Sequence, residues 1–198
     1  MSSVTSISCL NLLYFNNIPK KDRINLIFDL DETLINSKKS KYAENYNLSG
    51  ISNHDYIYKN IKTGQNSCHV WKRPFVDSVL FILSKYNNLY LLTRGGQDYA
   101  TDICYGIEIN DYFIEKKFRN DINLFNKENN SNGKNLTIFN NINIANSILI
   151  DDLKSNNVEN QRFIHVTPYS FCKRIDFELI KLLLNVTFQN TKYLLFFK

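Results

Sequence analysis

The chain has 198 residues, of which 43% are hydrophobic and 22% charged, and its formal net charge is +5. This balance excludes a disordered chain, and the low counts of Gly (6) and Pro (3) exclude collagen-like and Gly/Pro-rich low-complexity sequences. The charge is too small for the dense basic face of a nucleic-acid-binding protein, and no apolar run approaches the roughly 20 residues of a membrane-spanning helix.

Short apolar runs alternate with segments of helical periodicity along the chain. The runs have the β-branched and aromatic composition of buried parallel strands, and the periodic segments repeat apolar residues every three or four positions. In chain order we predict a strand at 24–28, a helix at 74–86, a strand at 89–92, a helix at 97–107, strands at 147–150 and 163–166, and a helix at 176–186. This alternation predicts an α/β domain with a central parallel sheet.

Two segments interrupt the alternation. Within residues 36–72, two strand-like stretches flank a turn at 62–66, so we expect a small β insertion. Its aromatic residues could bind a proline-containing peptide or simply pack the hairpin; they are Tyr56, Tyr58 and Trp71. In residues 120–146, 11 of 27 residues are Asn, and we expect mostly loop with a short helix at 135–144.

The chain ends and the cysteines bear on the cellular compartment. Residues 1–23 lack the basic region and cleavage site of a secretory signal, so we expect an N-terminal extension packed on the domain. The four cysteines are widely spaced and form no CxxC pair, which argues against a disulfide framework or a zinc site. We therefore expect reduced thiols in an intracellular compartment.

Two carboxylates, Asp29 and Asp31, directly follow the first predicted strand in the run FDLDETL. In an open α/β sheet, ligands bind beyond the carboxyl ends of the strands. Carboxylates buried there are costly unless a cation compensates them, and Mg²⁺ suits them because it takes hard oxygen ligands. A DxD motif also arises by chance in exposed turns, so this pair alone is a weak signal.

Other polar groups are expected at the same edge of the sheet. The second strand ends in Thr93 and Arg94, where a hydroxyl and backbone N–H groups can hold phosphate oxygens. The third ends in Asp151 and Asp152, and the loop before it carries Lys134. Each turn alone can be an ordinary polar strand end, but the set together indicates a site for a metal and a phosphate.

In order, FDLDETL, TRGG, Lys134 and LIDD resemble the four motifs of the haloacid dehalogenase superfamily. Within it, WKRPFVD, TRGGQDYA and KNLT resemble the FCP/SCP group, phosphatases of the RNA polymerase II C-terminal domain. The likeness covers residues 24–186. It implies a HAD-like Rossmannoid α/β domain with a central parallel sheet and a small β-hairpin insertion at 36–72, between an N-terminal extension (1–23) and a C-terminal tail (187–198).

The resemblance also implies roles for the residues at the strand ends. Asp29 is the implied nucleophile that forms an aspartyl-phosphate, and Asp31 the implied general acid and base. Thr93 and Lys134 are the implied catalytic groups that hold the phosphoryl group. The implied cofactor is Mg²⁺, with the ligand set Asp29, Asp31 through its carbonyl, Asp151 and Asp152, although Asp151 could instead pair with Lys134.

Two arginines are further candidate substrate-binding residues. Arg119 aligns with a family arginine that contacts substrate. Arg94 stands where the family has an uncharged residue, and it could contact the substrate anion or point to solvent. Asp152 stands where the small phosphatases more often have Asn, and the added charge should tighten metal binding.

Together these features predict a Mg²⁺-dependent protein serine/threonine phosphatase that acts on a phosphorylated protein or peptide, with the RNA polymerase II C-terminal domain as a candidate substrate. The alternatives are a small-molecule phosphatase on the same scaffold and a non-catalytic binding member of the family. The intact acidic and basic residues argue against the latter. We expect a monomer in the nucleus or cytoplasm, with no direct nucleic-acid binding and no membrane span.

Overall fold

A computed structural model of the chain describes residues 19–39, 54–59, 68–171 and 175–196. A five-stranded sheet forms its centre, with the strand order β6-β5-β1-β7-β8 and every pair parallel. Its strands are β1 (Asn25–Phe28), β5 (Asn88–Leu92), β6 (Glu115–Lys117), β7 (Ser147–Asp151) and β8 (Arg162–His165). The predicted α/β fold with a central parallel sheet is therefore confirmed.

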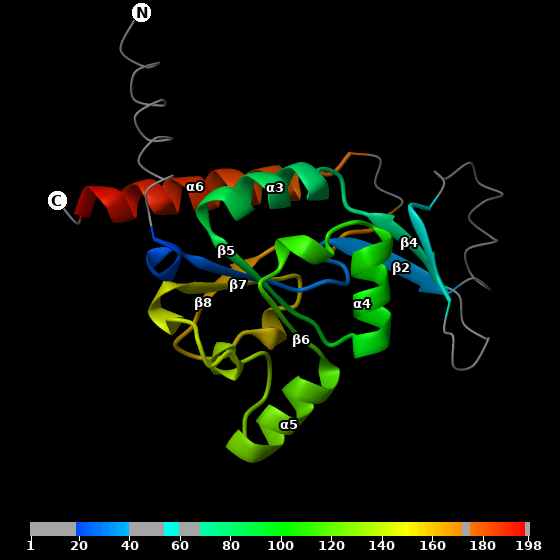
Figure 1. Ribbon diagram of the computed structural model, residues 1–198, viewed down its shortest axis with the longest axis horizontal. Helices are drawn as coiled ribbons and strands as arrows, with labels where there is room; N and C mark the ends of the chain where they lie inside the picture. Colours follow the sequence, from blue (N-terminus) through cyan, green and yellow to red (C-terminus); the bar gives the residue numbers. More distant parts are fainter. Residues whose placement is uncertain (1–18, 40–53, 60–67, 172–174, 197–198) are drawn as a thin grey trace, which may run out of the picture.

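Successive residues of a strand point to opposite faces of the sheet, and in the central strands the residues on both faces are buried. In β1, Leu26 and Phe28 join one core and Ile27 the other. The first core is shared with α3 (Val76–Tyr86), α4 (Gln97–Gly106) and α6 (Glu178–Phe196), and the second with α5 (Arg119–Asn129). Figure 1 shows α3 and α6 above the sheet and α5 below it. This double burial explains why the central strands read as continuous apolar runs.

The predicted insertion after the first strand is a separate antiparallel sheet with the order β2-β4-β3. Its strands are β2 (Ile35–Lys39), β3 (Tyr56–Tyr58) and β4 (Cys68–Lys72). The predicted turn at 62–66 lies outside the described residues. In Figure 1 this sheet lies at one end of the central sheet, beside α4. The insertion therefore adjoins the edge at which β1 ends.

The segment at 120–146 departs from its prediction, because residues 119–129 form helix α5 rather than a loop. The carboxylate of Asp121 accepts a 2.8 Å bond from the N–H of Phe118, which caps the helix, and Ile122 packs into the second core. Asn130 ends α5 in the left-handed conformation, which Asn tolerates. The short helix expected at 135–144 is replaced by two 3₁₀ turns at Leu136–Ile138 and Ile144–Asn146.

The last helix also differs from its prediction in start and end. It begins at Glu178 and continues to Phe196, and it buries Leu179 and Leu182. Phe177, inside the predicted range, precedes the helix and is 53% exposed. None of the helices in the described residues has the length and apolar character that crossing a bilayer requires.

Candidate functional site

The carboxyl ends of β1, β5 and β7 lie side by side in the sheet and open into a cavity of about 1020 Å³. Asp29 follows β1, and its backbone N–H donates to the carbonyl of Ile150 in β7 at 2.9 Å. The adjacent strand ends thus bring residues more than 100 positions apart into one site. The cavity is lined by all the predicted site residues but one, namely Asp29, Asp31, Thr93, Arg94, Arg119, Lys134 and Asp152; Asp151 is fully buried.

Lys134 is the buried cation of the site, with only 1% of its surface exposed. Its Nζ lies 2.6 Å from Asp29 Oδ1 and 2.7 Å from Asp151 Oδ2. Its backbone is fixed on both sides: its N–H donates to the carbonyl of Asn156 at 2.8 Å, and its carbonyl accepts from Gln161 at 3.0 Å. The ammonium therefore lies between two carboxylates at the floor of the cavity.

Three carboxylates at this floor could share a metal ion. Asp29, Asp151 and Asp152 are buried, and each offers an oxygen within 4.8 Å of the other two. With Asp31 beside them, four carboxylates face one ammonium, so a further cation would balance the charge. The donors are hard oxygens, which fit Mg²⁺ or a similar divalent ion. Thr33 donates to Asp152 Oδ1 at 3.3 Å and orients one of these groups.

Burial is the main cause of the shifted pKa values of these carboxyl groups, and neighbouring charges modify the shifts. Burial raises the pKa of Asp29 to about 7; Lys134 opposes this rise and Asp151 adds to it. Burial also raises the pKa of Asp152, and neighbouring Asp151 adds to this shift. A bound cation would favour the ionised form of both groups, so the structure fits a metal in chemistry as well as in geometry.

Asp31, which also lines the cavity, has its own hydrogen bonds. The hydroxyl of Tyr99 donates to its Oδ1 at 2.6 Å, and that of Ser37 at 3.4 Å. Burial raises the pKa of Asp31, while these two bonds oppose the rise. A carboxyl group with a raised pKa can hold a proton and release it to a leaving group. Sequence reasoning did not assign Tyr99 a role, although it lies in the TRGGQDYA run.

Hydrogen bonds at the ends of β5 and β7 fix further groups of the site, and one series of them links the exposed Arg94 through Asn156 to the buried Asp151. Thr93 Oγ1 accepts from the N–H of Gly95 at 3.0 Å. Arg94 is exposed, and its Nε donates to Asn156 Oδ1 at 3.0 Å, while Asn156 Nδ2 donates to both oxygens of Asp151. The exposed Arg119 donates to the carbonyl of Arg94 at 2.7 Å. The sequence does not distinguish Asn156 as a site residue, because 29 of the 198 residues are Asn.

The aromatic residues of the insertion pack within the protein. Trp71 is buried and stacks on Phe171 with ring centroids 4.2 Å apart. Tyr56 donates to Asp102 at 2.8 Å, and Tyr58 packs edge-on against Tyr99 while it lines the cavity. Among the three, Tyr58 is thus the one placed to contact a ligand, and the packing interpretation holds for Trp71. Cys68 and Cys104 are free thiols, whereas Cys9 and Cys172 lie outside the described residues.

Comparisons with known proteins find one matching sequence family and solved structures of similar fold. The sequence profile of the NLI interacting factor-like phosphatases matches residues 24–190. Two solved structures share the fold: a fission yeast RNA polymerase II CTD phosphatase Fcp1 variant bound to beryllium fluoride (TM-score 0.58, 21% identity, 86% of this chain and 46% of that chain) and Fcp1, described as an essential RNA polymerase II CTD phosphatase (0.59, 23%, 86% and 47%). The chain spans about half the length of these structures. No curated protein sequence matches it significantly.

Proposed function

The chain belongs to the NLI interacting factor-like phosphatase family, and from this premise we propose that it is a Mg²⁺-dependent protein serine/threonine phosphatase. The observation that carries the proposal is the buried group at the cavity floor, where Asp29 lies 2.6 Å from Lys134 within a cluster of three carboxylates. In this proposal residues 24–186 form the catalytic domain.

Asp29 is proposed to attack phosphorus, so that an Asp29 Oδ–P bond forms while the bond from phosphorus to the seryl or threonyl oxygen breaks. Asp31 gives its proton to that leaving oxygen, because an alkoxide leaves poorly without one. In the second step water attacks phosphorus, its proton passes to Asp31, and Asp29 is released as a carboxylate. The raised pKa of Asp31 supports this role, since the group must be protonated in the first step.

The other groups of the cavity stabilise charge on the phosphoryl group. Lys134 and Thr93 hold its oxygens, and Arg94 and Arg119 bind the substrate at the rim. Mg²⁺ would be held by Asp29, Asp152 and the carbonyl of Asp31, with Asp151 acting through Lys134, and it would neutralise charge between nucleophile and phosphate.

A phosphorylated protein segment is the substrate class we propose. The cavity, of about 1020 Å³, extends from the cluster of carboxylates past Tyr58 and Gln97, so it has room for residues on either side of a phosphoserine. The fold is shared with two Fcp1 structures, which makes the RNA polymerase II C-terminal domain a candidate substrate and the nucleus a candidate location.

The test compares wild type with Asp29→Asn on three substrates: a phosphoserine peptide, an aryl phosphate and a set of sugar phosphates, each with Mg²⁺ and with EDTA. We expect phosphate release from the peptide and the aryl phosphate, complete loss in EDTA, and loss in Asp29→Asn with folding retained. Asp111→Asn, at an exposed position, is the matched control. Full activity of Asp29→Asn or in EDTA contradicts the mechanism. Hydrolysis of sugar phosphates alone indicates a small-molecule phosphatase, and no release at all indicates a binding protein.

A further inference from the structure

The loop after β1 adopts a backbone conformation that its own sequence does not favour. Glu32, between the two catalytic aspartates and Thr33, has a φ of 60°, in the left-handed region that non-glycine residues rarely adopt. Such strain persists only where neighbouring groups hold it. Here the N–H of Glu32 donates to the carbonyl of Ile35 at 2.6 Å, and its carbonyl accepts from the N–H of Tyr169 at 2.7 Å.

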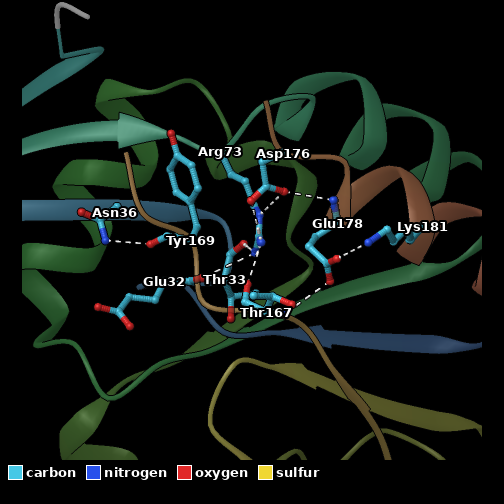
Figure 2. Close-up of polar contacts among 9 residues, drawn as sticks. All are labelled: Glu32, Thr33, Asn36, Arg73, Thr167, Tyr169, Asp176, Glu178 and Lys181. Atoms are coloured by element: carbon cyan, nitrogen blue, oxygen red, sulfur yellow. Dashed lines mark hydrogen bonds and ion pairs between the residues drawn. The ribbon is translucent and has the colours of Figure 1, made fainter. Parts of the chain in front are cut away.

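A buried arginine, which does not line the cavity, contacts the same loop (Figure 2). Arg73 is 1% exposed and all five of its side-chain N–H donors have an acceptor. Nη1 donates to the carbonyls of Thr33 at 3.0 Å and Glu32 at 3.5 Å, and Nη2 to the carbonyl of Thr167 at 2.6 Å. Nε and Nη2 form a bidentate pair with Asp176 at 3.1 and 3.0 Å.

The acceptors of Arg73 come from two distant parts of the chain. Glu32 and Thr33 belong to the catalytic loop, whereas Thr167 and Asp176 belong to the segment between β8 and α6. Asp176 also accepts from the N–H of Glu178 at 2.9 Å, so it joins the start of α6 to the same network. Figure 2 shows the guanidinium of Arg73 between these two segments.

One bond connects this network to the cluster of carboxylates. Thr33, whose carbonyl accepts from Arg73, donates through its hydroxyl to Asp152 at 3.3 Å. A shift of the Glu32 and Thr33 peptides would therefore move the hydroxyl on Asp152 and, through Glu32, the backbone of Asp31. Groups that orient a metal ligand in this way are typically needed for metal affinity and activity.

We infer that Arg73 and Asp176 are positioning residues, which hold the loop of Asp29 and Asp31 in its strained, metal-binding form by fastening it to the segment before α6. The inference rests on the proposed function. A buried ion pair adds little net stability compared with apolar residues of the same size, but its bidentate geometry allows one arrangement of the loop. Removing one partner alone leaves the other buried and unpaired, so a single substitution also lowers the free energy of unfolding.

The test uses Asp176→Asn, Arg73→Lys and Arg73→Gln in the full chain. Asp77→Asn is the matched control: Asp77 pairs with Lys72, next to Arg73, at 2.8 Å, but on the surface. Three quantities are measured: hydrogen exchange of the Leu34 and Ile35 amides in metal-free protein, the Mg²⁺ concentration that half-saturates binding by calorimetry, and kcat and KM on an aryl phosphate. The two amides report on the loop because both donate to the carbonyl of Leu30.

In Asp176→Asn we expect the hydrogen-exchange rates of both amides to rise about tenfold, and the half-saturating Mg²⁺ concentration to rise by the same factor. The kcat should fall about 10- to 100-fold, with KM little changed. Arg73→Lys should retain more activity than Arg73→Gln, although a lysine cannot reproduce the bidentate pair. Asp77→Asn should match wild type. If Arg73→Gln fails to fold, the other two variants decide the outcome.

The inference is overturned if Asp176→Asn and Arg73→Lys lower the melting temperature but leave amide exchange, Mg²⁺ binding and kcat as in wild type. That result would mean that the pair only stabilises the fold. If wild type releases no phosphate from any substrate, the proposed function fails, while amide exchange and Mg²⁺ titration still decide whether the pair positions the loop.

Discussion

Two buried cations contact the same short loop, and they do so in different chemical settings. Lys134 and Arg73 are each 1% exposed. Lys134 meets Asp29 at the start of the loop, and Arg73 meets the carbonyls of Glu32 and Thr33 at its end. Lys134 lines the cavity, whereas Arg73 does not.

The two cations differ in the number of carboxylates around them. Lys134 has two carboxylates in contact and Asp152 close by, and burial raises the pKa of Asp29 to about 7. Arg73 has one carboxylate and a complete set of acceptors. A surplus of carboxylates that faces a cavity marks a place where a ligand completes the charge. A balanced, fully bonded pair marks support for that place.

The largest expected effect separates the two cations directly. Lys134→Gln should lower kcat by about 10²- to 10³-fold, the usual cost of losing a group that stabilises transition-state charge. Arg73→Gln should cost about 10- to 100-fold, because it acts through the loop. The measurement is steady-state kinetics on an aryl phosphate at equal amounts of folded protein. Equal losses of kcat in the two variants would contradict the distinction between a cation that contacts the substrate and one that supports the loop.

Metal binding should depend on pH through Asp29. The pKa of Asp29 is raised from 3.8 to about 7 in the folded protein. Without metal, its protonation therefore contributes to the free energy of unfolding in full below about pH 4, and this contribution is lost as the pH rises through 7. Mg²⁺ should therefore stabilise the protein more at pH 8 than at pH 6. At about 100 times Kd the gain at pH 8 is about 2.7 kcal/mol, or roughly 5–10 °C in Tm.

Thermal unfolding at the two pH values, with Mg²⁺ and with EDTA, gives this difference. Asp29→Asn should reduce the pH dependence of the Mg²⁺ effect. A larger Mg²⁺ effect at pH 6 than at pH 8 in wild type would contradict the charge imbalance around Lys134.

A smaller effect is expected on the proton donor. Tyr99→Phe removes the 2.6 Å bond that stabilises ionised Asp31, so the pKa of Asp31 should rise further. The alkaline limb of the kcat/KM profile should then move to higher pH. Tyr105→Phe, on an exposed position of the same helix, is the control. A downward shift in Tyr99→Phe would argue against Asp31 as the acid.

The smallest effect concerns a third cation, on the surface near Arg73. Lys72 pairs with Asp77 at 2.8 Å, but their side chains are 24% and 58% exposed. Asp77→Asn should change the free energy of unfolding by less than about 1 kcal/mol and leave kcat unchanged. Urea denaturation tests this expectation. A loss as large as that of Asp176→Asn would show that burial does not distinguish the two pairs.

The central strands could be predicted because both of their faces are buried. β6 could not, since its three residues, Glu115–Lys117, are charged, half-buried and held at the sheet edge by pairing with β5. Helix α5 was also missed, because its Asn-rich sequence has low helix propensity. It forms through the cap from Asp121 and the burial of Ile122, which depend on tertiary packing.

The residues of the cavity floor could be predicted from the sequence because Asp29, Thr93 and Asp151 each follow or end an apolar strand. The supporting groups could not, because their roles depend on contacts between distant segments. Arg73 and Asp176 are 103 positions apart, and neither lies at the carboxyl end of a central strand. Asn156 is hidden by composition, since only its place between Arg94 and Asp151 distinguishes it.

The central claim is that Asp29 carries the phosphoryl group. The most direct measurement is to quench wild type during turnover of a phosphopeptide with Mg²⁺, reduce the protein with borohydride and sequence it by mass spectrometry. Reduction of an aspartyl-phosphate leaves homoserine, and we predict homoserine at position 29 and none in Asp29→Asn. Turnover with no modified residue, or with homoserine at position 31 instead, would contradict the account.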